Sequence, residues 1–118
     1  MGTVLPGDGY YTLVNVFTTE PVDQQAIYDA VVEATDVIEK FPGFISANVH
    51  RSHDGRRVVN YAQWRSKEDF DAMHRHPDVQ AHFKACRAIT DDIEPIFCRV
   101  SYVHRAADPA GGRHDSAG

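Results

Sequence analysis

Residues 44–65 read FISANVHRSHDGRRVVNYAQWR, and this stretch constrains the fold more than any other. Two runs rich in β-branched and aromatic residues, Phe44 to Ser52 and Arg56 to Arg65, lie on either side of Asp54-Gly55. An Asp-Gly pair between two such runs is the strongest short-range signal for a β-hairpin. The stretch therefore predicts two antiparallel strands joined by a tight turn.

The segment before the hairpin predicts a strand followed by a helix. Tyr10 to Thr19 is rich in aromatic and β-branched residues, as strands are. From Pro21 to Phe41, apolar residues recur at spacings of three and four, which gives one apolar helical stripe. Pro42-Gly43 ends this helix, because proline cannot continue it and glycine tolerates the exit geometry.

The segment after the hairpin predicts an interrupted helix and a last strand. Ser66 with Asp69 resembles a capping box that opens a helix. His76-Pro77 interrupts the helix, and residues 77–89 resume a helical pattern before residues 93–104 alternate as a strand does. Residues 106–118 contain no large apolar side chain, so we expect a flexible C-terminal tail.

The order of these elements is β-α-β-β-α-β, which predicts an α+β, ferredoxin-like fold in one domain over residues 1–105. One antiparallel sheet would carry both helices on one face. Its other face would then need cover, because five residues assigned to it suit water poorly: Tyr11, Leu13, Phe17, Tyr61 and Gln63. We therefore expect a homodimer in which two sheets pack back to back.

Composition excludes several classes of function. The chain has 118 residues and a formal net charge of -5, which argues against a nucleic-acid partner. No apolar run approaches the ~20 residues that a membrane span needs, and the N-terminus lacks the features of a signal peptide. Two cysteines fall short of a disulfide framework, and no glycine-rich nucleotide motif occurs. We expect a soluble, cytoplasmic protein.

The run Val58 to Trp64 holds the best candidates for chemistry. Alternation along a strand places Val58, Asn60, Ala62 and Trp64 on one face. The Asn60 amide and the Trp64 indole can each donate a hydrogen bond to a developing oxyanion, and the indole can also stack on a flat ring. The alternative is that Trp64 is a core residue and Asn60 an edge-strand amide.

Three motifs bring out a family resemblance: Pro42-Gly43-Phe44-Ile45-Ser46-Ala47, then His50 with Asp54-Gly55, then Val58 to Trp64. Over residues 10 to 104 the chain resembles the antibiotic biosynthesis monooxygenase family, above all the small quinone-forming oxygenases of aromatic polyketide pathways. This resemblance implies a dimeric α+β barrel with one cavity per subunit. It also implies oxidation of an anthrone-type polyketide by O₂ without metal, flavin or haem, so we expect no cofactor.

The resemblance also implies roles for individual residues. Asn60 would bind a substrate or peroxide oxygen, and Trp64 would donate its N–H and wall the cavity. His50 matches a family histidine and could accept the ring proton.

The length of the hairpin loop decides which face His50 occupies. A two-residue turn at Asp54-Gly55 pairs Val49 with Asn60 and turns His50 to the opposite face, whereas a three-residue loop brings His50 onto the Asn60 face.

Two positions depart from the family pattern. Phe70 stands where a tyrosine follows the tryptophan by six residues. An arginine expected on the later helix is replaced by Phe83 or Lys84, with Arg87 one turn further on. We expect Phe70, Phe83, Arg87 and Asn15 to contact the substrate.

Other functions remain open at this point. Haem-degrading oxygenases of the same fold are similar in Asn15, Trp64 and His74, and His74 would then be the iron ligand. A polyketide cyclase or a non-catalytic dimeric ligand-binding protein would use a similar cavity. The pairs His50/His53 and His74/His76 lack a third ligand at a recognisable spacing, so we expect no metal site.

Overall fold

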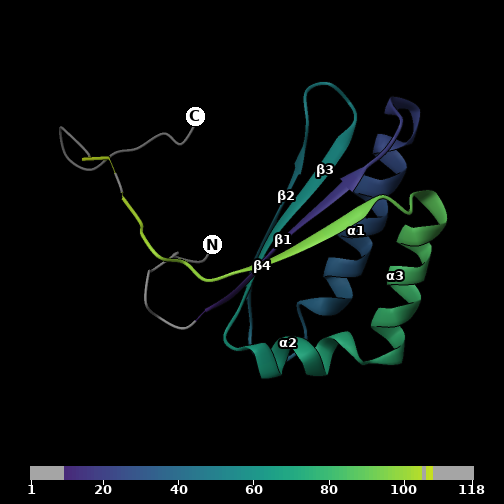
Figure 1. The fold of residues 1–118 in the computed structure, drawn as a ribbon. Coiled ribbons are helices and arrows are strands. Elements are labelled where there is room, and N and C mark those ends of the chain that lie inside the picture. Colours follow the sequence, from purple (N-terminus) through teal and green to yellow (C-terminus); the bar gives the residue numbers. More distant parts are fainter. Residues whose placement is uncertain (1–9, 105, 108–118) are drawn as a thin grey trace.

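The computed structural model describes residues 10–104, 106 and 107. Within this part of the chain, four antiparallel strands form one sheet in the order β2-β3-β1-β4. The elements are β1 (Tyr11–Thr18), the 3-10 turn η1 (Pro21–Asp23), α1 (Gln24–Ile38), β2 (Phe44–Arg51), β3 (Arg57–Trp64), α2 (Lys67–His74), α3 (Pro77–Ile89) and β4 (Ile93–Cys98). Figure 1 shows α1 and α3 side by side on one face of the sheet, with α2 across one end. The predicted ferredoxin-like α+β fold is confirmed.

The predicted hairpin forms, but through a longer loop than expected. The Ser52 N–H donates to the Arg57 carbonyl at 3.0 Å, which leaves four residues, His53 to Arg56, in the loop. A four-residue loop and the two-residue turn share the same midpoint between Asp54 and Gly55. Val49 therefore lies opposite Asn60, and His50 lies opposite Val59.

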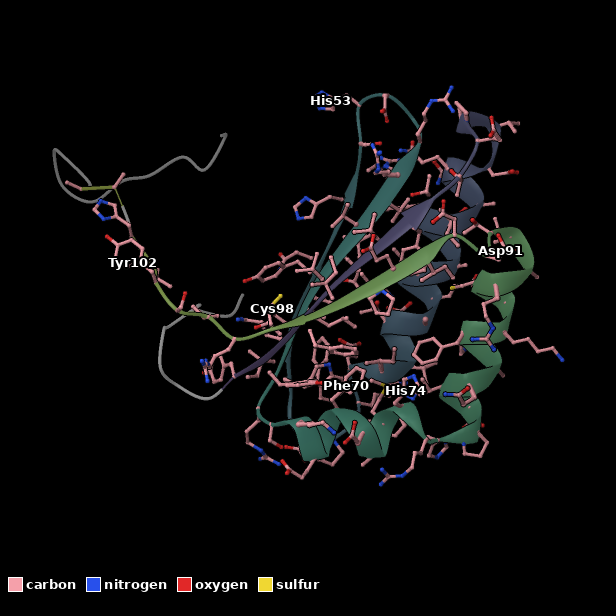
Figure 2. All side chains as sticks on the ribbon, viewed as in Figure 1. His53, Phe70, His74, Asp91, Cys98 and Tyr102 are labelled. Atoms are coloured by element: carbon pink, nitrogen blue, oxygen red, sulfur yellow. The ribbon has the colours of Figure 1, made fainter. Side chains whose placement is uncertain are left out.

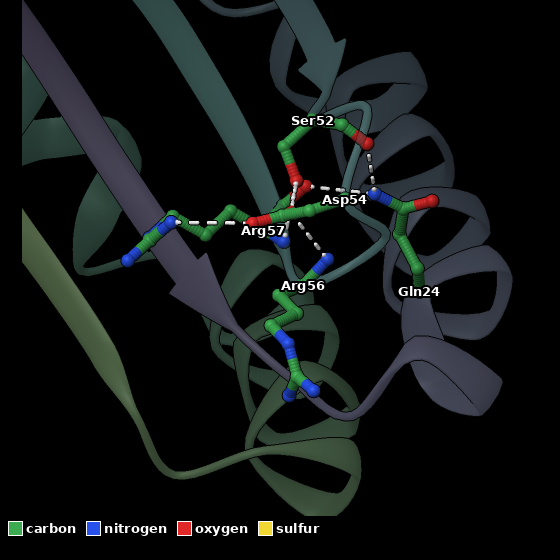
Figure 3. A network of polar contacts seen from close by, with 5 residues as sticks. All are labelled: Gln24, Ser52, Asp54, Arg56 and Arg57. Carbon is green, nitrogen blue, oxygen red and sulfur yellow. Dashed lines mark hydrogen bonds and ion pairs between the residues drawn. The ribbon is translucent and has the colours of Figure 1, made fainter.

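A polar network holds the hairpin tip against the start of α1 (Figure 3). The Asp54 carboxylate accepts hydrogen bonds from the Ser52 hydroxyl at 2.7 Å and from the Arg56 N–H at 2.9 Å. These two bonds hold the pKa of Asp54 below its usual value. The Gln24 side chain then donates to the carbonyls of Ser52 and Arg57, at 3.1 and 3.0 Å. The loop is thus bonded both internally and to the helix that covers the sheet.

The register of β1 against β3 corrects the expected composition of the outer face. Leu13 lies opposite Ala62 and Phe17 opposite Val58, so both share the helix-covered face with Asn60, as Tyr11 does. Only Tyr61 and Gln63 of the five expected residues lie on the other face. Alternation groups the residues within each strand, but the pairing between strands decides which group meets the helices.

The core divides into two clusters beneath the helices. One cluster joins Phe17 and Val58 of the sheet to Ile27 and Val31 of α1 and Cys86 of α3. The other cluster groups Trp64 with side chains of α2 and α3, namely Phe70, Met73 and Val79. The helices are therefore anchored at two ends of the sheet.

The starts of α2 and α3 follow the sequence signals, whereas α1 is shorter than the predicted Pro21 to Phe41 and the last strand is also shorter than predicted. The Ser66 hydroxyl accepts from the Asp69 N–H at 3.1 Å, which confirms Ser66 as the N-cap. The Asp69 carboxylate accepts from the Ser66 hydroxyl at 3.0 Å, so it does not make the second bond of a capping box. Strand β4 ends at Cys98 rather than at residue 104, because its last partner is Thr12 and β1 begins one residue earlier. The tail predicted over 106–118 lies outside the described residues, apart from 106 and 107.

None of the helices in the described ranges has the length and apolar character that crossing a membrane would require.

A stability prediction compares two glycines with left-handed backbone, Gly43 (φ 86°) and Gly55 (φ 78°). A Cβ in this conformation costs about 1–2 kcal/mol at either site. At Gly43 it would also overlap the Asp69 carboxyl group, whereas at Gly55 it would meet Pro21 at 3.3 Å. We expect Gly43→Ala to lower the free energy of unfolding more than Gly55→Ala, as measured by urea denaturation. Equal losses would contradict the packing of Asp69 on Gly43.

Candidate active site

A cavity of about 330 Å³ lies between the sheet and the helices. Its floor comes from the helix-covered face of all four strands, and its walls come from α1, α2 and α3. The lining is mostly apolar and aromatic, with a few polar groups, as is typical of small-molecule sites. The alternation of β1 and β3 aims every second side chain into this space.

Two asparagine amides lie next to each other on the cavity floor. Asn15 of β1 is paired with Asn60 of β3, so their side chains leave the central strands on the same face. The Oδ1 atoms of both are buried and have no hydrogen-bond partner among the described residues. An unpaired buried polar atom costs about 1–3 kcal/mol, so these acceptors favour a ligand that donates hydrogen bonds.

An aromatic group forms one end of the cavity. Trp64 is 1% exposed and meets the rings of Phe44 and Phe70 edge-on, with centroids 5.4 and 6.1 Å apart. Phe70 also packs against Tyr11 and Phe97, each at 5.5 Å. Phe44, Trp64, Phe70 and Phe97 all line the cavity, and such an aromatic wall suits a flat aromatic ligand.

The helices contribute the titratable groups. Arg87 and Cys86 line the cavity from α3, together with Phe83. Burial raises the pKa of the Cys86 thiol, so the uncharged form is favoured. His74, the last residue of α2, has its ring between Phe70 and Phe83, with centroids 5.6 and 5.2 Å away. Figure 2 shows Phe70 and His74 on the side of α2 that faces the sheet.

The structure brings together all but one of the predicted site residues. Those that line the cavity are Asn15, Asn60, Trp64, Phe70, Phe83 and Arg87. His50 is the exception: it is exposed, and its pairing with Val59 turns it to the opposite face of the sheet. The structure therefore does not bring His50 into this cavity, because the hairpin has the register in which Val49 lies opposite Asn60.

Two lining residues, Cys86 and His74, are not among the residues predicted for the oxygenase site. Cys86 is one apolar position of an amphipathic helix, and His74 stands in a polar stretch beside Arg75. The sequence suggested His74 only as the iron ligand of the haem-degrading alternative, and its spacing of one helical turn from Phe70 is a second signal that places it near the cavity. No group of three or more His, Cys, Asp and Glu residues in the described ranges is arranged to hold a metal ion.

Comparisons with known proteins agree with this architecture. The chain is 47% identical over 112 residues to tetracenomycin-F1 monooxygenase of Streptomyces glaucescens. The aligned region covers 94% of this chain and 99% of that protein. The ActVA-Orf6 monooxygenase of Streptomyces coelicolor, solved with nanaomycin D, superposes with a TM-score of 0.69 at 25% identity, over 84% of this chain and 93% of that one. SnoaB, a cofactor-independent oxygenase of Streptomyces nogalater, shares the fold with a TM-score of 0.65 at 23% identity, over 86% and 99%.

The family described as "Antibiotic biosynthesis monooxygenase" matches residues 10–85. This range includes β1, the hairpin and α2, and therefore the strands that carry Asn15, Asn60 and Trp64. The resemblance read from the sequence is confirmed, and the chain belongs to the antibiotic biosynthesis monooxygenase family.

Proposed function

We propose that this protein oxidises an anthrone-type ring of a polycyclic phenolic polyketide intermediate to a quinone with O₂. The observation that carries the proposal is a cavity in which two unpartnered amide oxygens lie beside an aromatic wall. Such a cavity fits a flat ligand whose phenolic hydroxyls can donate to the amides. The similarity to a monooxygenase named for tetracenomycin F1 supports this class of substrate.

The chemistry needs few protein groups. Loss of a proton from the anthrone methylene carbon leaves a delocalised carbanion, which transfers an electron to O₂ and combines with the resulting superoxide. The hydroperoxide on that carbon then loses its remaining C–H proton and a hydroxide ion, which leaves a C=O group and one water molecule. The electrons come from the substrate, so we propose that no metal, flavin or haem takes part.

Each cavity residue has a proposed part in this sequence. Asn15 and Asn60 accept hydrogen bonds from substrate hydroxyls, and their amide N–H groups can donate to the oxyanion of the deprotonated ring. Trp64 donates its N–H and, with Phe70 and Phe83, walls the ring system. Arg87 adds a permanent positive charge near the developing anion. The enclosing helices limit the access of water to the peroxide intermediate.

Oxygen consumption with the anthrone dithranol, without added metal or flavin, tests the reaction. We expect uptake above the spontaneous rate, reduced about 10²-fold in Asn60→Ala because an oxyanion partner is lost. Trp64→Phe, which keeps a ring but loses the N–H, should also be slower. Asn48→Ala is the matched control, since Asn48 pairs with Tyr61 and faces away from the cavity.

Unchanged rates in both cavity variants would contradict the assigned site. If the wild-type protein consumes no oxygen, the reaction class is wrong, and a polyketide cyclase or a haem-degrading enzyme becomes the better hypothesis. A haem titration distinguishes these two, because a Soret band lost in His74→Ala would indicate an iron ligand.

Ligand binding can be followed through the single tryptophan of the chain, Trp64. Because this indole lines the cavity, we expect 1,8-dihydroxyanthraquinone to quench its emission saturably. Asn15→Leu should weaken the binding, because it removes a hydrogen-bond partner and keeps the branched shape of the side chain. Quenching that is linear and equal to that of free N-acetyltryptophanamide would contradict binding in the cavity.

We also propose that the protein works as a homodimer in the cytoplasm. The outer face of the sheet carries half-buried Val14, Val16 and Tyr61 beside Ile96, which is 42% exposed.

Light scattering should give about twice the chain mass of 13.2 kDa. Val16→Glu should produce a monomer, since the charge would be buried without a partner. The same change at Val22, which is 86% exposed on η1, is the control. A monomeric wild-type protein would contradict this arrangement.

A further inference from the structure

We propose that His74 is the catalytic base that removes the proton from the methylene carbon of the substrate. This inference rests on the proposed function and supplies the group that His50 was expected to provide. It assigns the step to the C-terminal end of α2, on the helix side of the cavity, opposite the asparagine pair.

The first argument is the short supply of proton acceptors. Among the described residues that line the cavity, the titratable side chains are His74, Cys86 and Arg87. An arginine keeps its proton in proteins. Burial of the Cys86 thiol disfavours its thiolate form. Imidazole is the side chain that ordinarily exchanges a proton near neutral pH, which leaves His74 as the acceptor.

The second argument is the position of the imidazole. Its ring lies between Phe70 and Phe83, in tilted contact with both, where a flat substrate would enter the aromatic end of the cavity. His74 is also exposed to solvent, so it can release a proton to water after each turnover. A group that lines the cavity and also meets the solvent can carry protons between them.

The third argument is that this position is held. The His74 carbonyl accepts a hydrogen bond from the Gln80 side chain of α3 at 2.6 Å. The next helix is capped nearby, where the His76 imidazole accepts from the Asp78 N–H at 3.1 Å. These bonds hold the backbone of the turn between α2 and α3, from which the His74 side chain extends, and a base on an ordered backbone gains the advantage of orientation.

One base is enough to account for both protons that leave the methylene carbon. His74 takes the first methylene proton and returns it to the terminal oxygen of the peroxide formed with O₂. The neutral imidazole then takes the second hydrogen of the same carbon as a proton, while the O–O bond breaks. That proton joins the departing hydroxide, so the products are the quinone carbonyl and one water molecule.

Hydrogen exchange without oxygen isolates the proposed step. Dithranol is incubated anaerobically in D₂O with the protein, and loss of the methylene signal is followed by NMR. We expect the wild-type protein to accelerate the exchange and His74→Gln to slow it by about 10²-fold, the usual contribution of a general base. Added imidazole should restore exchange in His74→Ala, a rescue that a purely structural role would not give. His82→Gln is the matched control, since His82 is on α3 and does not line the cavity.

The outcomes separate this inference from the proposed function. Exchange in His74→Gln at the wild-type rate, with quinone still bound as shown by Trp64 quenching, overturns the role of His74. Wild-type exchange without oxygen uptake overturns the oxygenase reaction, and it supports His74 as a base if His74→Gln slows that exchange. If the wild-type protein accelerates neither process, both proposals fail. Circular dichroism of His74→Gln and His74→Ala verifies that the variants fold.

Discussion

The pairing of β1 with β3 at the centre of the sheet is the constraint on which the site depends. Backbone hydrogen bonds set Asn15 opposite Asn60, and a shift by one residue would turn one amide to the other face. The same register lines up Leu13 with Ala62 and Phe17 with Val58, so the floor around the amides is apolar. Two polar groups are thus held in an otherwise hydrophobic layer by main-chain geometry.

The helices complete the site because Phe70 joins them to this floor. Its ring contacts Trp64 of β3 and Tyr11 of β1 and also packs against His74, the last residue of the same helix. The capping contact between Ser66 and Asp69 fixes where that helix begins. The position of Phe70, and with it the aromatic end of the cavity, follows from that start. Packing of this kind is sensitive to small changes in volume.

Much of the fold could be predicted because its signals are local. The Asp54-Gly55 turn, the N-cap at Ser66 and the break at Pro77 each act within a few residues. The end of β4 could not be predicted, since it depends on where β1 begins. The face of His50 depended on loop length, and the inward position of Leu13 on its partner strand. The role of His74 as a base needed the three-dimensional cavity, because the sequence suggested this residue only as the iron ligand of the haem-degrading alternative.

The sheet and the helices contribute different side chains to the cavity, and this difference has an evolutionary consequence. The amides belong to strands whose geometry is set by pairing, whereas Ile38, Met73 and Phe83 reach the cavity from helices. A helix side chain can change in size without altering the strand register. Related enzymes can therefore adapt to larger or smaller ring systems through substitutions in the helices while they keep the same pair of hydrogen-bonding groups.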